Sequence, residues 1–186
     1  MNAMKKVILI AMTLVAVLAA PLAHAEEPAF TLLITGGAEE NVLSVKLSLD
    51  GREYVIDSTA PLEVGGAVCT HPEAVENRLL CEATAIAGFE VNAGGGSDSA
   101  IISPRIKIPV TLRGGLGDDR LYGGSANDKL VGGSGEDTLI GRAGNDALYG
   151  GPGDDQLYAG SGDDIVSGGP GEDEIVGGPG HNLITP

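Results

Sequence analysis

The chain has 186 residues and a formal net charge of −15, from 26 Asp and Glu residues against 11 Lys and Arg residues. This length leaves no room for several large domains. A strongly negative field repels nucleic acid and anionic membranes and attracts cations. We therefore expect no nucleic-acid partner and a preference for positively charged ligands.

Residues 1–25 are typical of a secretory signal peptide. Two lysines precede an apolar run, Val7–Ala20, and Ala23-His24-Ala25 matches a small-residue cleavage site. The apolar run is short for a membrane span, and the alternative is an uncleaved anchor. We predict a mature chain that begins at Glu26, has no membrane span after cleavage, and is secreted to the extracellular space.

Residues 26–92 are expected to form a small N-terminal β cap unit. Phe30–Thr35 is a candidate strand, and Gly88–Asn92 is another. Apolar and polar residues alternate over Leu43–Leu49, Asp50-Gly51 interrupts them, and Tyr54–Ile56 resumes the pattern. This arrangement predicts a β-hairpin with a type I′ turn.

Cys69 and Cys81 are the only cysteines of the chain. In a secreted protein such a pair indicates a disulfide that closes a short loop, and two free thiols are the alternative. A zinc site is not expected, because four ligands are needed and His71 is the only other soft ligand nearby.

Residues 93–113 are interpreted as a transitional coil between the cap and a repetitive segment. Ala93–Ile101 is a degraded copy of the repeat described below, with Asp98 at its acidic position. A strand is expected over Ile106–Leu112. Asp98 lies 21 residues before Asp119, whereas equivalent positions further on are 18 residues apart, so this turn carries an insertion.

From Gly114 to Thr185 a nine-residue unit occurs eight times without a gap, in the form Gly-Gly-x-Gly-x-Asp-x-apolar-x. Position six holds Asp119, Asp128, Asp137, Asp146, Asp155, Asp164 and Asp173, and then Asn182. Position eight holds Leu121, Leu130, Leu139, Leu148, Leu157, Val166, Ile175 and Ile184. Each unit therefore combines a glycine-rich loop, a metal-ligand candidate and a core residue.

This period predicts an all-β fold in which parallel strands stack into a β-helix. Glycine permits positive φ and close backbone approach, so six residues form a turn and three form a strand. Two repeats complete one coil, which places odd and even loops on opposite edges. Position eight should point inward and positions seven and nine outward. Residues 114–186 form this unit.

The predicted core is thin, with one large apolar residue per repeat, and the stacked carboxylates repel one another about 5 Å apart. A hard divalent cation would neutralise and bridge them. Carboxylate and carbonyl oxygens favour Ca²⁺ over softer metals and over Mg²⁺, which retains its water. Without calcium we expect the segment to be disordered.

The repeats resemble the RTX, or haemolysin-type, calcium-binding repeat proteins. The resemblance implies a right-handed parallel β-roll in which each ion lies between successive loops on one edge, bound by position-six Asp side chains and loop carbonyls. Carried over, the ligands would be the seven position-six aspartates. They pair as Asp119–Asp137, Asp137–Asp155 and Asp155–Asp173 on one edge and as Asp128–Asp146 and Asp146–Asp164 on the other, about five calcium ions in all.

Some positions depart from the family pattern. Arg142 replaces Gly at position two, Ala126 at position four, and Ala159 at position one. Ala126 leaves the carbonyl geometry of the second loop open. Asn182 lacks the acid, so a site there should be weak or absent, and a contribution from Asp98 is left open.

No catalytic motif accompanies the repeats. There is no His-Glu-x-x-His and no Gly-x-Ser-x-Gly. We expect a secreted, non-enzymatic calcium-binding protein with a structural or adhesive role. The alternatives are a small secreted enzyme with an unrecognised N-terminal activity, which uses the repeats for stability, and a calcium-dependent folding tag without a partner.

A partner surface is suggested by position nine of the odd repeats. These residues should line up on one outer face as an apolar stripe that supports self-association or contact with a cell-surface partner. Plain β propensity is the alternative explanation. The stripe consists of Tyr122, Ile140, Tyr158 and Val176.

Overall fold

The computed structural model describes residues 30–59, 69–70, 78–83 and 86–186, and their regular elements are all β-strands. The expected signal peptide, residues 1–25, lies outside this part of the chain. Within the described residues, no helix has the length and apolarity needed to cross a membrane.

The strands form two sheets. The first is parallel throughout, in the order β1 (Phe30–Thr35), β6 (Ile86–Gly95), β8 (Val110–Leu116), β10 (Lys129–Ser134), β12 (Ala147–Tyr149), β14 (Ile165–Ser167) and β16 (Leu183–Thr185). The second has the order β15 (Glu174–Val176), β13 (Gln156–Ser161), β11 (Thr138–Ala143), β9 (Arg120–Tyr122), β7 (Ser99–Ile102), β2 (Val42–Leu47), β3 (Glu53–Ser58), β5 (Arg78–Glu82) and β4 (Cys69–Thr70).

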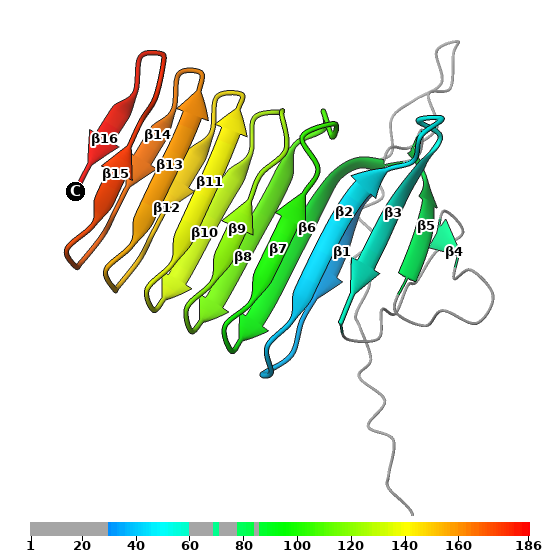
Figure 1. Ribbon diagram of the computed structural model, residues 1–186, viewed down its shortest axis with the longest axis horizontal. Helices are drawn as coiled ribbons and strands as arrows, with labels where there is room; N and C mark the ends of the chain where they lie inside the picture. Colours follow the sequence, from blue (N-terminus) through cyan, green and yellow to red (C-terminus); the bar gives the residue numbers. More distant parts are fainter. Residues whose placement is uncertain (1–29, 60–68, 71–77, 84–85) are drawn as a thin grey trace, which may run out of the picture.

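From β6 onward, successive strands of the chain alternate between the two sheets, so the backbone winds as a β-solenoid (Figure 1). Equivalent residues of the repeats are strand partners: Leu121 pairs with Leu139, and Leu139 pairs with Leu157. The prediction of an all-β chain with parallel sheets wound as a β-roll is confirmed. The period of nine produces it because each repeat contributes one turn and one strand.

The core is a single column of apolar side chains between the sheets. Leu121, Leu130 and Leu139 have no exposed surface, and position eight stays fully buried as far as Val166. Ile175 is partly buried, and Ile184 is 44% exposed. Burial at position eight therefore fails only in the last two repeats, where few or no further coils follow to cover the side chain.

The N-terminal strands belong to the same sheets as the repeats. β1 pairs with β6 and β2 pairs with β7, both in parallel, and the expected boundary between residues 92 and 93 falls inside β6. The antiparallel strands β3, β5 and β4, which come between β2 and β6 in the chain, extend the second sheet outward beyond β2 (Figure 1). The solenoid thus begins at β1, and the expected cap is an extension of one of its sheets.

The core is wider at this end of the molecule. The rings of Tyr54 and Phe89 meet edge to face with their centroids 5.0 Å apart. Ile56, Leu79 and Ile86 are buried around them. This region can bury more apolar surface per residue than the thin column further on, and apolar burial is the main source of stability.

The hairpin between β2 and β3 is confirmed, but the expected type I′ turn is wrong. A type I′ turn needs positive φ at both central residues. Here only Gly51 has positive φ, at 75°, and its N–H donates to the carbonyl of Ser48 at 3.1 Å. Asp50 stays in the ordinary region, and its side chain accepts a hydrogen bond from the Ser48 hydroxyl at 2.6 Å.

The strand expected over Ile106–Leu112 begins only at Val110. The N–H of Ile106 donates to the carbonyl of Ser103 at 2.9 Å, which turns the chain there. Ile106 is nevertheless fully buried in the core. The insertion expected between Asp98 and Asp119 thus lies in a turn before β8, and it supplies a core residue.

The two cysteines occupy facing positions of an antiparallel strand pair. Cys69 in β4 is the register partner of Cys81 in β5, and Cys81 is fully buried. This register is compatible with the expected disulfide, because facing residues of antiparallel strands bring their Cβ atoms close together. The pairing itself stays a prediction.

Candidate metal-binding loops

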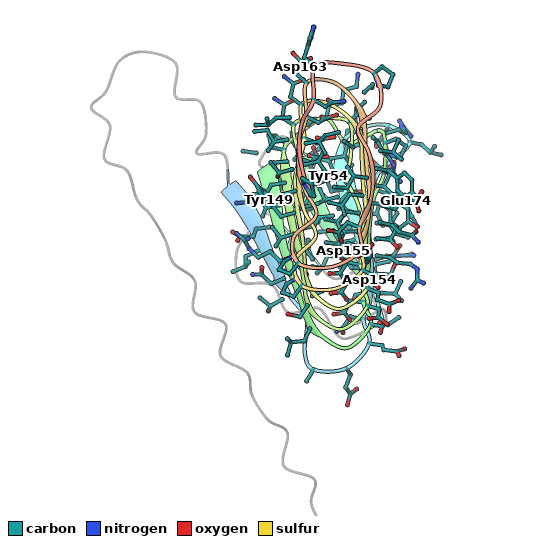
Figure 2. The ribbon with its side chains drawn as sticks, turned by 90° about the vertical axis from the view of Figure 1, so that its left-hand side faces the viewer. Tyr54, Tyr149, Asp154, Asp155, Asp163 and Glu174 are labelled. Carbon is teal, nitrogen blue, oxygen red and sulfur yellow. The ribbon has the colours of Figure 1, made fainter. Side chains whose placement is uncertain are left out.

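The loops lie at the two edges of the flattened coil. Viewed along the solenoid, Asp163 stands at one edge, and Asp154 and Asp155 stand at the other (Figure 2). Even repeats therefore supply one row of loops and odd repeats the other. This is the two-sided arrangement expected from the sequence.

Glycines at positions two and four let the loops stack. Gly133 and Gly135 have φ of 125° and 137°, a region that residues with a Cβ rarely adopt. A Cβ added to Gly133 would lie 2.1 Å from the carbonyl oxygen of Gly115, one coil earlier. The spacing of the loops thus depends on backbones that approach without side chains.

The position-six aspartates are joined by hydrogen bonds from coil to coil. On the odd edge, the N–H of Asp119 donates to Oδ1 of Asp137 at 2.8 Å, and the N–H of Asp137 donates to Oδ1 of Asp155 at 2.8 Å. The even edge repeats this pattern from Asp128 to Asp146, Asp164 and Asn182. Each carboxylate is thereby held by the coil before it, and the predicted ligands form two columns.

The second oxygen of most of these carboxylates has no protein partner. Oδ2 is buried without a hydrogen bond in Asp98, Asp119, Asp137, Asp146, Asp155 and Asp164. A buried charged oxygen without a partner costs several kcal/mol in order of magnitude. Buried polar atoms are otherwise almost always paired, so this repeated exception indicates a cation as the missing partner.

Burial also perturbs the titration of the columns. It raises the pKa of Asp119, Asp128, Asp137, Asp146 and Asp155 to about 6. Desolvation is the largest cause, because it disfavours the charged form, and neighbouring carboxylates add to it on several of these residues. A bound cation would reverse this effect by stabilising the ionised form.

The available donor set suits calcium. The described residues contain no group of three or more His, Cys, Asp or Glu side chains that could hold a metal ion. The stacked loops instead offer position-six carboxylates of successive coils together with backbone carbonyls. Calcium accepts many oxygen ligands in flexible geometry, including backbone carbonyls, so the residues present fit it.

Two residues on the N-terminal side extend the odd column. The N–H of Asp98 donates to Oδ1 of Asp119 at 2.7 Å, and the N–H of Asn41 donates to Oδ1 of Asp98 at 2.6 Å. Asp98, which the sequence left open, is thus part of the column. Asn41 was missed, although the glycine pair Gly36-Gly37 before it is a remnant of the repeat.

Asn182 occupies the last place of the even column as an amide. Its Oδ1 accepts from the N–H of Asp164 at 3.0 Å, and its Nδ2 donates to the carbonyl of Gly178 at 3.0 Å. The amide therefore places a donor where the other repeats place a free oxygen. That a site at this end is weak or absent stays a prediction.

Position five forms a second ladder that sequence reasoning missed. The N–H of Glu136 donates to Oδ1 of Asp118 at 3.0 Å, and the N–H of Asp163 donates to Oδ1 of Asn145 at 3.0 Å. Here the later coil donates to the earlier one, the reverse of position six. The preference for Asp and Asn at this position was the available signal.

Comparisons with known proteins agree with this geometry. The family model described as RTX calcium-binding nonapeptide repeat (4 copies) matches residues 111–139, 122–157, 131–166 and 149–184. No curated protein and no solved structure matches the chain significantly. Residues 111–184 are therefore an array of RTX calcium-binding nonapeptide repeats.

Proposed function

We propose that the protein is a secreted, non-enzymatic structural module that calcium folds and stiffens, with an adhesive role at its outer surface. The observation that carries the proposal is that six buried aspartates of the two columns have an Oδ2 atom without a protein partner. Calcium binding by RTX repeats supports the same conclusion.

In this proposal the chain acts through its loops. Oδ1 of each aspartate fixes the preceding coil, and Oδ2 together with loop carbonyls faces the ion. Calcium supplies the positive charge that cancels repulsion between the stacked carboxylates. The sequence suggests about five ions. The C-terminal end of the roll, where Asp173 is half-buried, should hold its ion least tightly.

A calcium titration of residues 26–186 tests this function. Far-ultraviolet circular dichroism should change from coil to β on adding calcium, cooperatively, and revert with a chelator. Affinity should fall in the extracellular range, roughly 10⁻⁴–10⁻³ M. A chain whose repeats are already fully β-folded in excess chelator would contradict it.

Secretion rests on the sequence of residues 1–25. The expected result of expressing the full chain in a secreting host is an exported protein whose N-terminal residue is Glu26. Replacing Lys5, Lys6 and the apolar run with polar residues should keep it inside the cell. Equal export of both forms would contradict a signal peptide.

An adhesive role rests on the stripe Tyr122, Ile140, Tyr158 and Val176. These residues are consecutive register partners in β9, β11, β13 and β15. Ile101 extends the stripe as the partner of Tyr122, and Ile101 and Val176 are 38% and 45% exposed. A contiguous apolar row on an outer sheet face is a typical contact surface.

Replacing Tyr122, Ile140 and Tyr158 with Thr tests the stripe. The variant should still fold with calcium, because the β propensity of Thr is high and the core is untouched. It should lose the calcium-dependent association that light scattering is expected to detect in the wild type. A wild type that stays monomeric and binds no cell-surface material would refute this role.

A further inference from the structure

The second loop, Gly123–Asp128, is built differently from the other loops of the array. Gly124 at position two and Ala126 at position four do not adopt positive φ. Oδ2 of Asp128 accepts a hydrogen bond from the N–H of Gly124 at 2.6 Å, whereas Oδ2 of the other deeply buried position-six aspartates has no partner. The carboxylate of Asp128 therefore has a hydrogen-bond partner within its own loop.

Arg142, one coil later at position two, explains the difference. It is the one non-glycine residue with positive φ in the described chain, at 82°. At equivalent glycines an added Cβ would meet the carbonyl oxygen one coil earlier, at 2.1 Å for Gly133 and 1.9 Å for Gly151. Because Arg142 carries a real Cβ, the carbonyl of Gly124 cannot take that place. The second loop is reshaped to admit the arginine.

The side chain of Arg142 then runs along the even edge past two earlier coils. Its Nη1 donates to the carbonyl of Gly123 at 2.5 Å and also to the carbonyl of Ile102. The guanidinium carbon lies 5.7 Å from the centre of the Tyr122 ring, a cation–π contact. A partly buried positive charge thus binds backbone carbonyls of two successive coils.

The charge lies at the second loop, because the carbonyl of Gly123, to which the guanidinium donates, belongs to the same loop as Asp128. A partly buried guanidinium that donates to backbone carbonyls of two coils supplies what calcium would supply there: positive charge and bonds to oxygen.

We propose that Arg142, whose backbone lies in the fourth loop and whose guanidinium binds the carbonyls of Gly123 in the second loop and of Ile102 one coil earlier, is a built-in cation that takes the place of calcium at the second loop. The pair Asp128–Asp146 then binds no ion, in contrast to the expectation from the repeat pattern. The inference rests on the proposed calcium binding by the remaining loops. It makes the N-terminal coils of the even edge independent of calcium, while the odd edge and the later coils depend on it.

Counting bound calcium by native mass spectrometry tests the proposal. The proteins are residues 26–186 as wild type, as Ala126→Gly, and as Ala126→Gly/Arg142→Gly, which restores the repeat pattern in both loops. The double variant should bind one calcium ion more than the wild type, and Ala126→Gly alone should gain none because the arginine remains. An unchanged count in the double variant, or a gain in Ala126→Gly alone, would overturn the proposal. A wild type that binds no calcium would instead refute the proposed function.

A second variant keeps the test decisive even if the double variant does not fold. Arg142→Gln keeps a long side chain in the gap and removes its charge. The calcium concentration at the midpoint of folding should rise several-fold. Arg120→Gln, which removes an exposed charge of the neighbouring strand β9, is the matched control and should stay within about twofold of the wild type. Equal midpoints for Arg142→Gln and Arg120→Gln would contradict the role of Arg142.

Discussion

Asp137 combines two roles that substitution can separate. Its Oδ1 accepts the buried N–H of Asp119 at 2.8 Å, and its Oδ2 is buried without a partner. Asp137→Asn keeps the acceptor and removes the charge. Its new Nδ2 can donate to the loop carbonyl four residues earlier, as Asn182 does to Gly178. Asp137→Ala removes both oxygens and leaves the N–H of Asp119 unpaired.

The magnitudes follow from these contacts. Leaving a buried N–H unpaired costs about 1–3 kcal/mol, so Asp137→Ala should be less stable than Asp137→Asn by that amount in saturating calcium. Loss of a charged ligand costs about 1.5–3 kcal/mol, which corresponds to at least about a tenfold higher calcium midpoint for Asp137→Asn. Urea unfolding measures the first difference, and calcium titration followed by circular dichroism measures the second.

Asp173→Asn is the matched control on the same edge. Its carboxylate is half-buried, and no later odd coil follows it, so its calcium midpoint should shift less than that of Asp137→Asn. Equal shifts would contradict the stacked arrangement of sites. If Asp137→Asn has the same calcium midpoint as the wild type, calcium binding by Oδ2 of Asp137 is refuted. If Asp137→Ala and Asp137→Asn are equally stable in urea, the hydrogen bond from the N–H of Asp119 does not contribute the stability given above.

Three further predictions concern the core, pH and the cysteines. Leu139→Ala should cost about 2–5 kcal/mol in urea unfolding because the side chain is fully buried, whereas Ile184→Ala, 44% exposed, should cost under about 1 kcal/mol, and equal losses would be inconsistent with the described core. Burial raises the pKa of Asp137 and four equivalent aspartates from 3.8 to about 6, so the folded calcium-free chain holds protons that the unfolded chain releases. Acidification through this window should therefore stabilise the calcium-free roll relative to the unfolded chain and weaken calcium binding to the folded roll, and a chain in excess chelator whose β signal in circular dichroism is the same at pH 7 and pH 5 would argue against it. Cys69→Ser should destabilise the N-terminal strands by about 2–3 kcal/mol, and alkylation of both wild-type thiols under native oxidising conditions would refute the disulfide.

Much of the fold follows from the period of the sequence. Leu121, Leu139 and Leu157 recur every 18 residues and became strand partners in the core. The aspartates recur at the same interval and became the two columns. Such contacts are predictable because the strand partners of a residue in the repeats always lie 18 residues before and after it in the sequence. The sequence pattern therefore also indicates which residues are neighbours in space.

The non-repetitive contacts could not be predicted in this way. Asn41 reaches Asp98 across 57 residues, because β3, β4 and β5 are inserted within the first coil. In the sequence, Arg142 and Ala126 are two separate departures from the repeat pattern, although the Cβ of Arg142 imposes the loop conformation that tolerates Ala126. The two substitutions are linked by a contact between the second and fourth loops, which lie in neighbouring coils. Comparing each repeat separately with the repeat pattern does not reveal this contact.

The separation of 18 residues in the aspartate ladder also limits how such an array can change length in evolution or by design. Duplicating or deleting two consecutive repeats downstream of Arg142 keeps every contact between neighbouring coils, because the separation of 18 residues is preserved. Changing the array by one repeat would move each later loop to the opposite edge and pair odd loops with even ones. Between Ile102 and Arg142 even a two-repeat change would separate the guanidinium from the carbonyls of Gly123 or Ile102. Growth in whole coils at the C-terminal side is therefore the route open to this architecture.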